Sequence, residues 1–119
     1  MATLIPAPAR IPAAGTPPKQ ILEFVGRVAT DTASVSVAIM ESPAGWAEPS
    51  QRPAFDEYTV VLEGEVHAET EEGLLVVSSG QALHARPGER VRYSTPAAGG
   101  ARYVSVCVPA FSPETVHRV

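Results

Sequence analysis

The sequence predicts an all-β protein that folds as a small antiparallel barrel of about eight strands. Short segments rich in Val, Ile, Leu and Tyr recur along the chain, and turns of Gly, Pro, Ser or Glu separate them. No window shows sustained helical periodicity. The 119 residues are one domain's length, and their 45% hydrophobic and 18% charged content is typical of globular proteins rather than disordered ones.

Eight segments are predicted as strands because each is short, rich in strand-forming residues and bounded by turn residues. They are Ile21–Val28, Ser34–Glu41, Glu57–Glu63, Glu65–Thr70, Leu74–Ser78, Gln81–Ala85, Arg90–Thr95 and Ala101–Val108. Residues 34–39 alternate small polar and apolar side chains, as do residues 103–108. This period of two is typical of a strand with one buried face. Glu71-Glu72-Gly73 is predicted as a polar hairpin turn between two of the strands.

The two ends of the chain differ from the middle. Residues 1–18 hold five of the twelve prolines, which remove amide donors and block helices. We therefore predict an extended N-terminal arm, followed by a barrel domain over residues 19–119. Apolar residues such as Ile11 would let the arm pack against the barrel, and a free tail is the alternative. Near the other end, Ser112-Pro113-Glu114 has the pattern of a helix start and predicts one helical turn.

Charge and composition limit the partners. The net charge is −4 and the pI is about 5.3, which does not suit nucleic acid as a general partner because phosphate binding requires a basic surface. Nine acidic residues lie between residues 41 and 72, whereas four arginines lie between residues 86 and 102. The arginine-rich stretch is either a solvated strand face or a rim that attracts an anionic ligand.

Cellular location is predicted from cysteine usage and hydropathy. The single cysteine, Cys107, cannot form an internal disulfide, so we expect a cytoplasmic protein. No apolar run approaches the roughly 20 residues of a membrane span, and residues 1–18 lack the basic region and apolar core of a signal peptide. We therefore expect no membrane partner.

The segment from Phe55 to Gly64 belongs to a longer pattern of spaced residues. Five residues separate Gly45 from Gln51-Arg52-Pro53, and three more separate this triplet from Glu57. Gly64 ends the pattern after six further residues. This order and spacing resemble the first motif of the cupin family, in which histidines occupy the first and third positions of the central triplet.

A second pattern runs from Gly80 through Pro87-Gly88 to Val91 and resembles the second cupin motif, whose last residue is a third histidine. The resemblance covers about residues 34–108. It implies a jelly-roll barrel of antiparallel strands, commonly a homodimer, with one metal ion held by imidazoles inside. In this chain Gln51, Pro53 and Val91 stand at the three histidine positions.

These substitutions predict a degenerate metal site. Imidazole nitrogens are the preferred ligands of Zn, Fe, Ni and Cu ions. Pro53 and Val91 offer no ligand atom, so only Glu57 and Gln51 remain as two weak oxygen ligands. We therefore expect no tightly bound cofactor, and a divalent metal would need further ligands from elsewhere in the chain.

Five residues are candidates for the site. The resemblance implies that Glu57 points into the barrel, where partial burial would suit a catalytic general base. Alternation places His84 and Arg86 on one strand face. If that face lines the cavity, His84 would be a second catalytic acid–base residue and Arg86 an anion clamp. Tyr93 would supply a hydroxyl and Gln51 an amide as further ligand contacts.

Structural explanations stand beside these roles. Glu57 would then be an ion-paired structural residue, His84 a surface residue and Tyr93 an aromatic wall. Cys107 would be buried as a small apolar side chain, or would become a nucleophile only through a tertiary contact.

Three functions remain open at this level, and the fold does not choose among them. The first is a barrel that binds a small anionic metabolite. The second is a metal-independent isomerase, cyclase or lyase with Glu57 as general base and His84 or Tyr93 as proton donor. The third is a metal-dependent cupin with an atypical ligand set. Whether the chain is an enzyme is therefore left undecided.

Overall fold

The structure is a computed structural model that describes all of residues 1–119, and it has nine strands and one short helix. The strands are β1 (Ala9–Ile11), β2 (Gln20–Val25), β3 (Ser36–Ser42), β4 (Trp46–Ala47), β5 (Asp56–Thr70), β6 (Gly73–Ser78), β7 (Ala82–Ala85), β8 (Val91–Thr95) and β9 (Ala101–Val108). The helix α1 spans Pro113–Val116. The predicted all-β architecture is confirmed.

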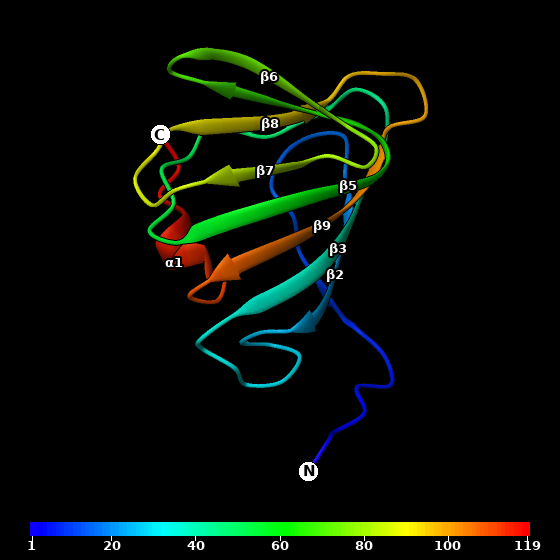
Figure 1. Cartoon of the computed structure of the whole chain (residues 1–119), viewed down its shortest axis with the longest axis vertical. Helices are drawn as coiled ribbons and strands as arrows, with labels where there is room; N and C mark the ends of the chain where they lie inside the picture. The colour runs from blue at the N-terminus through cyan, green and yellow to red at the C-terminus, as the bar shows by residue number, and fades with distance from the viewer.

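The strands form two sheets that share β5, and every pairing is antiparallel. The first sheet has the order β1-β2-β3-β9-β5-β7, and Figure 1 shows its strands from β2 to β7 side by side. The second sheet has the order β4-β8-β5-β6. Since one strand serves both sheets, the assembly curls into a barrel instead of remaining an open sheet.

The change of sheet occurs at Gly64. Residues 56–64 of β5 pair with β9, whereas residues 65–70 pair with β6 and β8. Gly64 has φ of +76°, and an added Cβ would lie 2.1 Å from the carbonyl oxygen of Gly100. Only glycine fits this close backbone approach. The two strands predicted on either side of Gly64 are therefore one continuous strand that bends without leaving its ladder.

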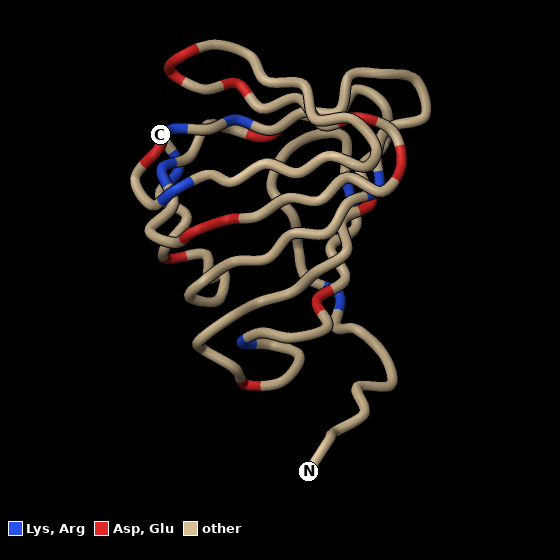
Figure 2. The backbone as a smooth tube through the Cα atoms, in the orientation of Figure 1, with Lys and Arg blue, Asp and Glu red and all other residues tan.

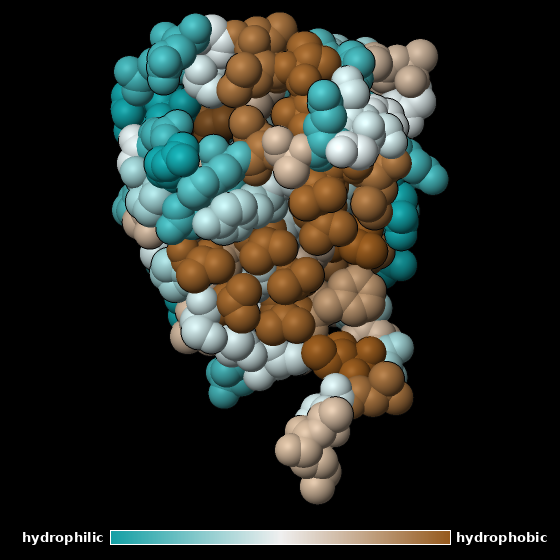
Figure 3. All heavy atoms as spheres, in the orientation of Figure 1, coloured by the Kyte–Doolittle hydropathy of each residue, from teal (hydrophilic) through white to brown (hydrophobic).

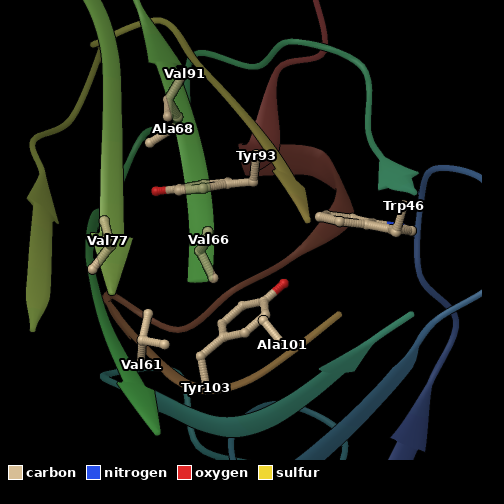
Figure 4. Close-up of a cluster of buried hydrophobic side chains, with 9 residues drawn as sticks. All are labelled: Trp46, Val61, Val66, Ala68, Val77, Val91, Tyr93, Ala101 and Tyr103. Atoms are coloured by element: carbon tan, nitrogen blue, oxygen red, sulfur yellow. The ribbon is translucent and has the colours of Figure 1, made fainter. Parts of the chain in front are cut away.

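Alternation along the strands separates an apolar core from the outer surface. Nine buried side chains from β4, β5, β6, β8 and β9 converge inside the barrel, as Figure 4 shows. They are Trp46, Val61, Val66, Ala68, Val77, Val91, Tyr93, Ala101 and Tyr103. A second cluster of Phe55, Cys107 and Val116 lies where α1 meets the barrel. The space between the two clusters is available to a ligand.

The N-terminal arm is partly incorporated into the barrel. β1 adds to the first sheet by pairing with β2, and the backbones of Thr16 and Ala47 exchange two hydrogen bonds of 3.0 Å. The indole Nε1 of Trp46 donates to the carbonyl oxygen of Ala14 at 3.2 Å. Between these contacts Gly15 has φ of +93°, and a Cβ there would lie 2.4 Å from the Ala47 oxygen. In Figure 1 the residues before β1 extend away from the barrel.

The C-terminal residues run beside the segment that precedes β5. Ser112 caps α1 by accepting a hydrogen bond from the amide of Glu114 at 3.2 Å, so the predicted helix start yields one turn. Backbone hydrogen bonds then join residues 115, 117 and 119 to residues 54, 52 and 50. At four residues, α1 is the longest helix in the structure, and none is long or apolar enough to cross a membrane.

Substitution of two motif glycines should distinguish the energetic cost of a close backbone contact from the cost of a positive φ angle alone. Gly64→Ala should lower the free energy of unfolding by about 3 kcal/mol or more, because the backbone must move away from Gly100. Gly80→Ala should cost only about 1–2 kcal/mol, since φ at Gly80 is +84° but no atom lies within 4 Å of the added Cβ. Urea unfolding of both variants measures the difference, and equal losses would contradict this explanation.

Candidate ligand-binding site

A cavity of about 320 Å³ lies inside the barrel, between the first sheet, β8, the N-terminal arm and the C-terminal segment. One part of its wall is apolar and includes Met40, Phe55 and Phe111. The other part carries polar and charged side chains from several elements. They include Lys19, Glu23, Glu48, Gln51, Glu57, Tyr93 and Arg118. This size and mixture of surfaces match the usual properties of a pocket for one small molecule.

Glu57 enters the cavity from β5 with one carboxylate oxygen fixed. Its Oε2 accepts a hydrogen bond of 2.8 Å from Ser105 Oγ, and Cys107 Sγ lies 3.8 Å from the same oxygen. Ser105 and Cys107 face Glu57 because β9 pairs with β5 at these positions. The second oxygen, Oε1, is buried and has no hydrogen-bond partner. The carboxylate is therefore oriented on one side and unpaired on the other.

Tyr93 brings a second unpaired group into the cavity. It follows Val91 on the inward face of β8, and both residues are buried. The Tyr93 hydroxyl is buried without a hydrogen-bond partner. Burial, together with the negative charges of Glu57 and Glu48, raises the pKa of Tyr93 well above its ordinary value. The hydroxyl therefore keeps its proton and is available as a donor.

Glu48 provides a third buried atom without a hydrogen bond, Oε2. The residue follows β4 and is 7% exposed. Arg118 Nη1 lies 3.4 Å from this oxygen, close enough for an ion pair but without hydrogen-bond geometry. Burial raises the pKa of Glu48 to about 7, although the positive charges of Lys19 and Arg118 oppose the shift. Glu48 therefore changes its charge near neutral pH.

Lys19 immediately precedes β2, and its ammonium group lies against aromatic rings. Its Nζ is 3.9 Å from the centre of the Trp46 ring and donates a hydrogen bond of 3.2 Å to the Tyr103 hydroxyl. No carboxylate lies within ion-pair distance of Lys19 in the structure. Burial lowers the pKa of Lys19 to about 8, and the carboxylates of Glu48 and Glu57 only partly offset this effect.

Gln51 lies at the cavity wall, but its side-chain oxygen is already engaged. The backbones of Gln51 and Val91 exchange hydrogen bonds of 3.0 and 2.9 Å, which hold the segment against β8. The Oε1 atom of Gln51 accepts a hydrogen bond from Arg118 Nη1. Gln51 therefore positions the Arg118 guanidinium group at the polar end of the cavity.

The structure does not bring His84 and Arg86 together with Glu57. His84 Nε2 lies 2.7 Å from Asp56 Oδ1, and its ring stacks on Tyr58 with centroids 4.3 Å apart. Neither His84 nor Arg86 lines the cavity. Alternation placed the two on one strand face, but the buried residue is Ala85, which lies between them at the end of β7. The predicted roles of His84 as an acid–base residue and of Arg86 as an anion clamp required the face that carries them to point into the cavity, and it does not.

Four charged cavity residues were missed by sequence reasoning, namely Lys19, Glu23, Glu48 and Arg118. Lys19, Glu23 and Arg118 come from segments outside the motifs, and Glu48 occupies a position between Gly45 and Gln51 at which the first motif specifies no residue, so the motif spacing could not identify them. The sequence did contain one signal that could have drawn attention to Lys19, which is the only lysine in the chain.

The positions that hold a metal in the resembled family do not fit one here. Val91 is 1% exposed within the apolar core, and Pro53 has no ligand atom. Gln51 Oε1 is bound to Arg118, whose positive charge opposes a cation. No group of three or more His, Cys, Asp or Glu side chains is arranged to hold a metal ion. The donor set that remains beside Glu57 is therefore too small for a resident transition metal.

Solved structures with the same architecture place the chain among cupin-fold proteins. The polyketide cyclase RemF from Streptomyces resistomycificus aligns with 100% of this chain and 84% of its own, with a TM-score of 0.77 and 14% identity. A predicted oxalate decarboxylase from Thermotoga maritima aligns over 92% and 99%, with a TM-score of 0.73 and 16% identity. The EutQ protein of Clostridium difficile aligns over 87% and 74%, with a TM-score of 0.64 and 16% identity. At these identities the likeness shows the fold, which is a cupin barrel.

Sequence comparison adds one curated relative. Endoribonuclease YbeY from Myxococcus xanthus is 46% identical over 99 residues, which make up 83% of this chain and 34% of that protein. The chain thus spans about a third of the relative's length. No protein-family model matches the sequence.

The raised pKa of Glu48 predicts a pH dependence of stability. The folded protein holds this proton up to about pH 7, whereas the unfolded chain releases it near pH 4.5. The contribution of Glu48 to stability should therefore fall as pH rises through this window and should be fully lost above it. Between pH 5 and 8, wild type should lose on the order of 2 kcal/mol more than Glu48→Gln. Chemical denaturation across the range measures this, with exposed Glu89→Gln as control, and parallel curves for wild type and Glu48→Gln would contradict it.

Proposed function

We propose that this chain is a barrel protein that binds a small organic molecule in its interior cavity. The proposal rests on three buried polar atoms that lie at one cavity and have no hydrogen bond: Tyr93 OH, Glu57 Oε1 and Glu48 Oε2, the last of which has only an ion-pair contact with Arg118. Each such atom costs the folded state about 1–3 kcal/mol when it lacks a partner. A ligand that offers partners to all three would remove this cost on binding.

The chemistry of the wall defines the class of ligand. Glu57 and Glu48 accept hydrogen bonds, which suits hydroxyl groups, whereas Tyr93 donates one. Lys19 and Arg118 attract a carboxylate or carbonyl oxygen. They would thus provide the positive charge near the ligand that was expected from Arg86. The apolar wall suits a short hydrocarbon body or ring. We therefore propose a small hydroxylated acid or carbonyl compound, consistent with the anionic metabolite expected from sequence.

A second candidate function is a metal-independent isomerase, cyclase or lyase. The observation that favours it is the asymmetry of Glu57, since Ser105 holds one oxygen and leaves the other free to take a proton. Tyr93 retains its proton and would serve as the donor. Among proteins of this fold, RemF is a polyketide cyclase, so the architecture accommodates such chemistry.

RNA cleavage is not proposed for this chain. The endoribonuclease named above is about three times as long as the aligned part, and the net charge of −4 here does not suit a polyanionic partner.

A ligand screen tests both functions. Hydroxy acids, oxo acids and phenols are added to the protein, and the melting temperature identifies those that bind. Tyr93→Phe and Glu57→Gln should each weaken binding about tenfold or more, because each removes a hydrogen bond to a buried polar group. Glu89→Gln, on the exposed surface, should leave affinity unchanged. Equal affinity of wild type and both cavity variants for every ligand would contradict the proposed site.

Product analysis of the same mixtures distinguishes the binder from the enzyme. Binding without turnover supports the first function. Turnover that Glu57→Gln abolishes while the variant stays folded supports the second, and full turnover by that variant removes Glu57 as the base.

We further propose that the chain forms a homodimer through the outer face of the first sheet. Register aligns apolar side chains into two rows across neighbouring strands of this face. The rows are Leu22, Ile39, Val104 and Val60, and Val37, Val106 and Tyr58. Figure 3 shows these strands covered by apolar residues, and Figure 2 shows charges mainly at strand ends and turns. Two such faces are self-complementary and can stack as aligned sheets.

Charge placed within one row tests the dimer. Val104→Lys should convert the protein to a monomer in light scattering after size-exclusion chromatography, because two copies would bury opposing ammonium groups. Leu75→Lys, on exposed β6 outside the rows, should leave the mass unchanged. A monomeric wild type would contradict the proposal.

A further inference from the structure

Lys19 is the single lysine of a chain with eight arginines, and it lies in the cavity. We propose that its amine forms a covalent imine with a small aldehyde or ketone bound there. This inference rests on the proposed function, because it uses the same cavity, and adds a covalent step to it. Arginine cannot take this role, since its guanidinium group stays protonated and is not nucleophilic.

The geometry holds the amine at a defined place on the wall. Nζ lies 3.9 Å from the centre of the Trp46 ring and 5.5 Å from that of Tyr103, and it donates one hydrogen bond to the Tyr103 hydroxyl. Ser42 Oγ lies 2.9 Å from this hydroxyl and fixes it in turn. Because an ammonium group has three donors and forms no ion pair here, part of its capacity is free for a ligand in the cavity.

The charges around Lys19 favour a reactive amine. Burial lowers the pKa of Lys19 to about 8, the negative charges of Glu48 and Glu57 only partly offset this effect, and the positive charge of Arg118 adds to it. A substantial neutral fraction therefore exists in mildly alkaline solution, as in other lysines that act as nucleophiles. Glu48, on the same cavity wall, has a pKa raised to about 7 and retains protons that it can donate.

Imine formation requires only the Lys19 amine, the carbonyl compound and proton transfers. The nitrogen lone pair of Lys19 attacks the carbonyl carbon, a C–N bond forms, and the π pair of the C=O bond moves to oxygen. A proton passes from nitrogen to that oxygen and gives a carbinolamine. Glu48 then protonates the hydroxyl group, which leaves as water while the nitrogen lone pair forms the C=N bond. The products are a protonated imine and water, and the Glu48 carboxylate recovers its proton from solvent.

Reductive trapping tests the inference directly. The full chain is incubated with salicylaldehyde or glyoxylate and sodium cyanoborohydride, which adds hydride to the C=N bond and makes the adduct permanent. Mass spectrometry of the intact protein and its peptides then locates each adduct. Lys19 should react about tenfold faster than the exposed amine introduced by Arg102→Lys, because more of it is neutral. Lys19→Arg should remove the cavity adduct and leave reaction at the N-terminus unchanged.

The pH dependence of trapping in the wild type needs no variant. The rate at Lys19 should pass through a maximum between about pH 7 and 8, where part of Lys19 is neutral and part of Glu48 is still protonated, whereas an ordinary lysine gains its neutral form only toward pH 10. A rate no greater than that of the exposed amine, or a rise only near pH 10, would overturn the inference. Ligands that bind through Tyr93 and Glu57 would still support the proposed function in that case, so the two proposals fail separately.

Discussion

The barrel depends on one close approach of two backbones, where Gly64 of β5 passes Gly100. Because no side chain intervenes, β5 bends there and continues from the first sheet into the second. The inward side chains of the two halves of the strand then lie in different parts of the barrel interior. Before the bend, Glu57 and Thr59 line the cavity; after it, Val66 and Ala68 belong to the closed apolar core. A single strand thus supports both a polar site and the packing that stabilises it.

The two chain ends complete the cavity. The arm crosses from β1 to its contact with β4, and Lys19 follows, immediately before β2. The C-terminal segment pairs with residues 50–54 and brings Arg118 to Glu48 and Gln51. These additions convert an open barrel mouth into a partly enclosed space. Enclosure weakens the solvation of every charge inside, which moves the pKa of Lys19 and that of Glu48 toward neutral pH from opposite directions.

The sequence predicted the parts of the fold that depend on local pattern. Alternation located the main strands, and motif spacing directed attention to Glu57 and Tyr93, which line the cavity. It missed β1 and β4 because two or three residues are too short for a period to be visible. It separated β5 into two strands because a glycine usually ends a strand, whereas this one permits a bend.

The site was less predictable because its polar groups meet through tertiary structure. Alternation assigns side chains to two faces but does not say which face is inward, and for that reason the position of His84 remained open in the sequence. Lys19 and Arg118 are about 100 residues apart in the chain and share a cavity only because both termini fold against the barrel. No local pattern carries that information.

Tyr93, Glu57 and Glu48 each have a buried atom without a hydrogen bond, and a molecule bound inside the barrel would satisfy these atoms. A crystal structure of the chain soaked with the compound that raises its melting temperature most tests this claim directly. We expect density for that compound in the cavity, within hydrogen-bond distance of Tyr93 OH and Glu57 Oε1. A compound bound on the outer surface, with the cavity collapsed and the three polar atoms paired to one another, would contradict it.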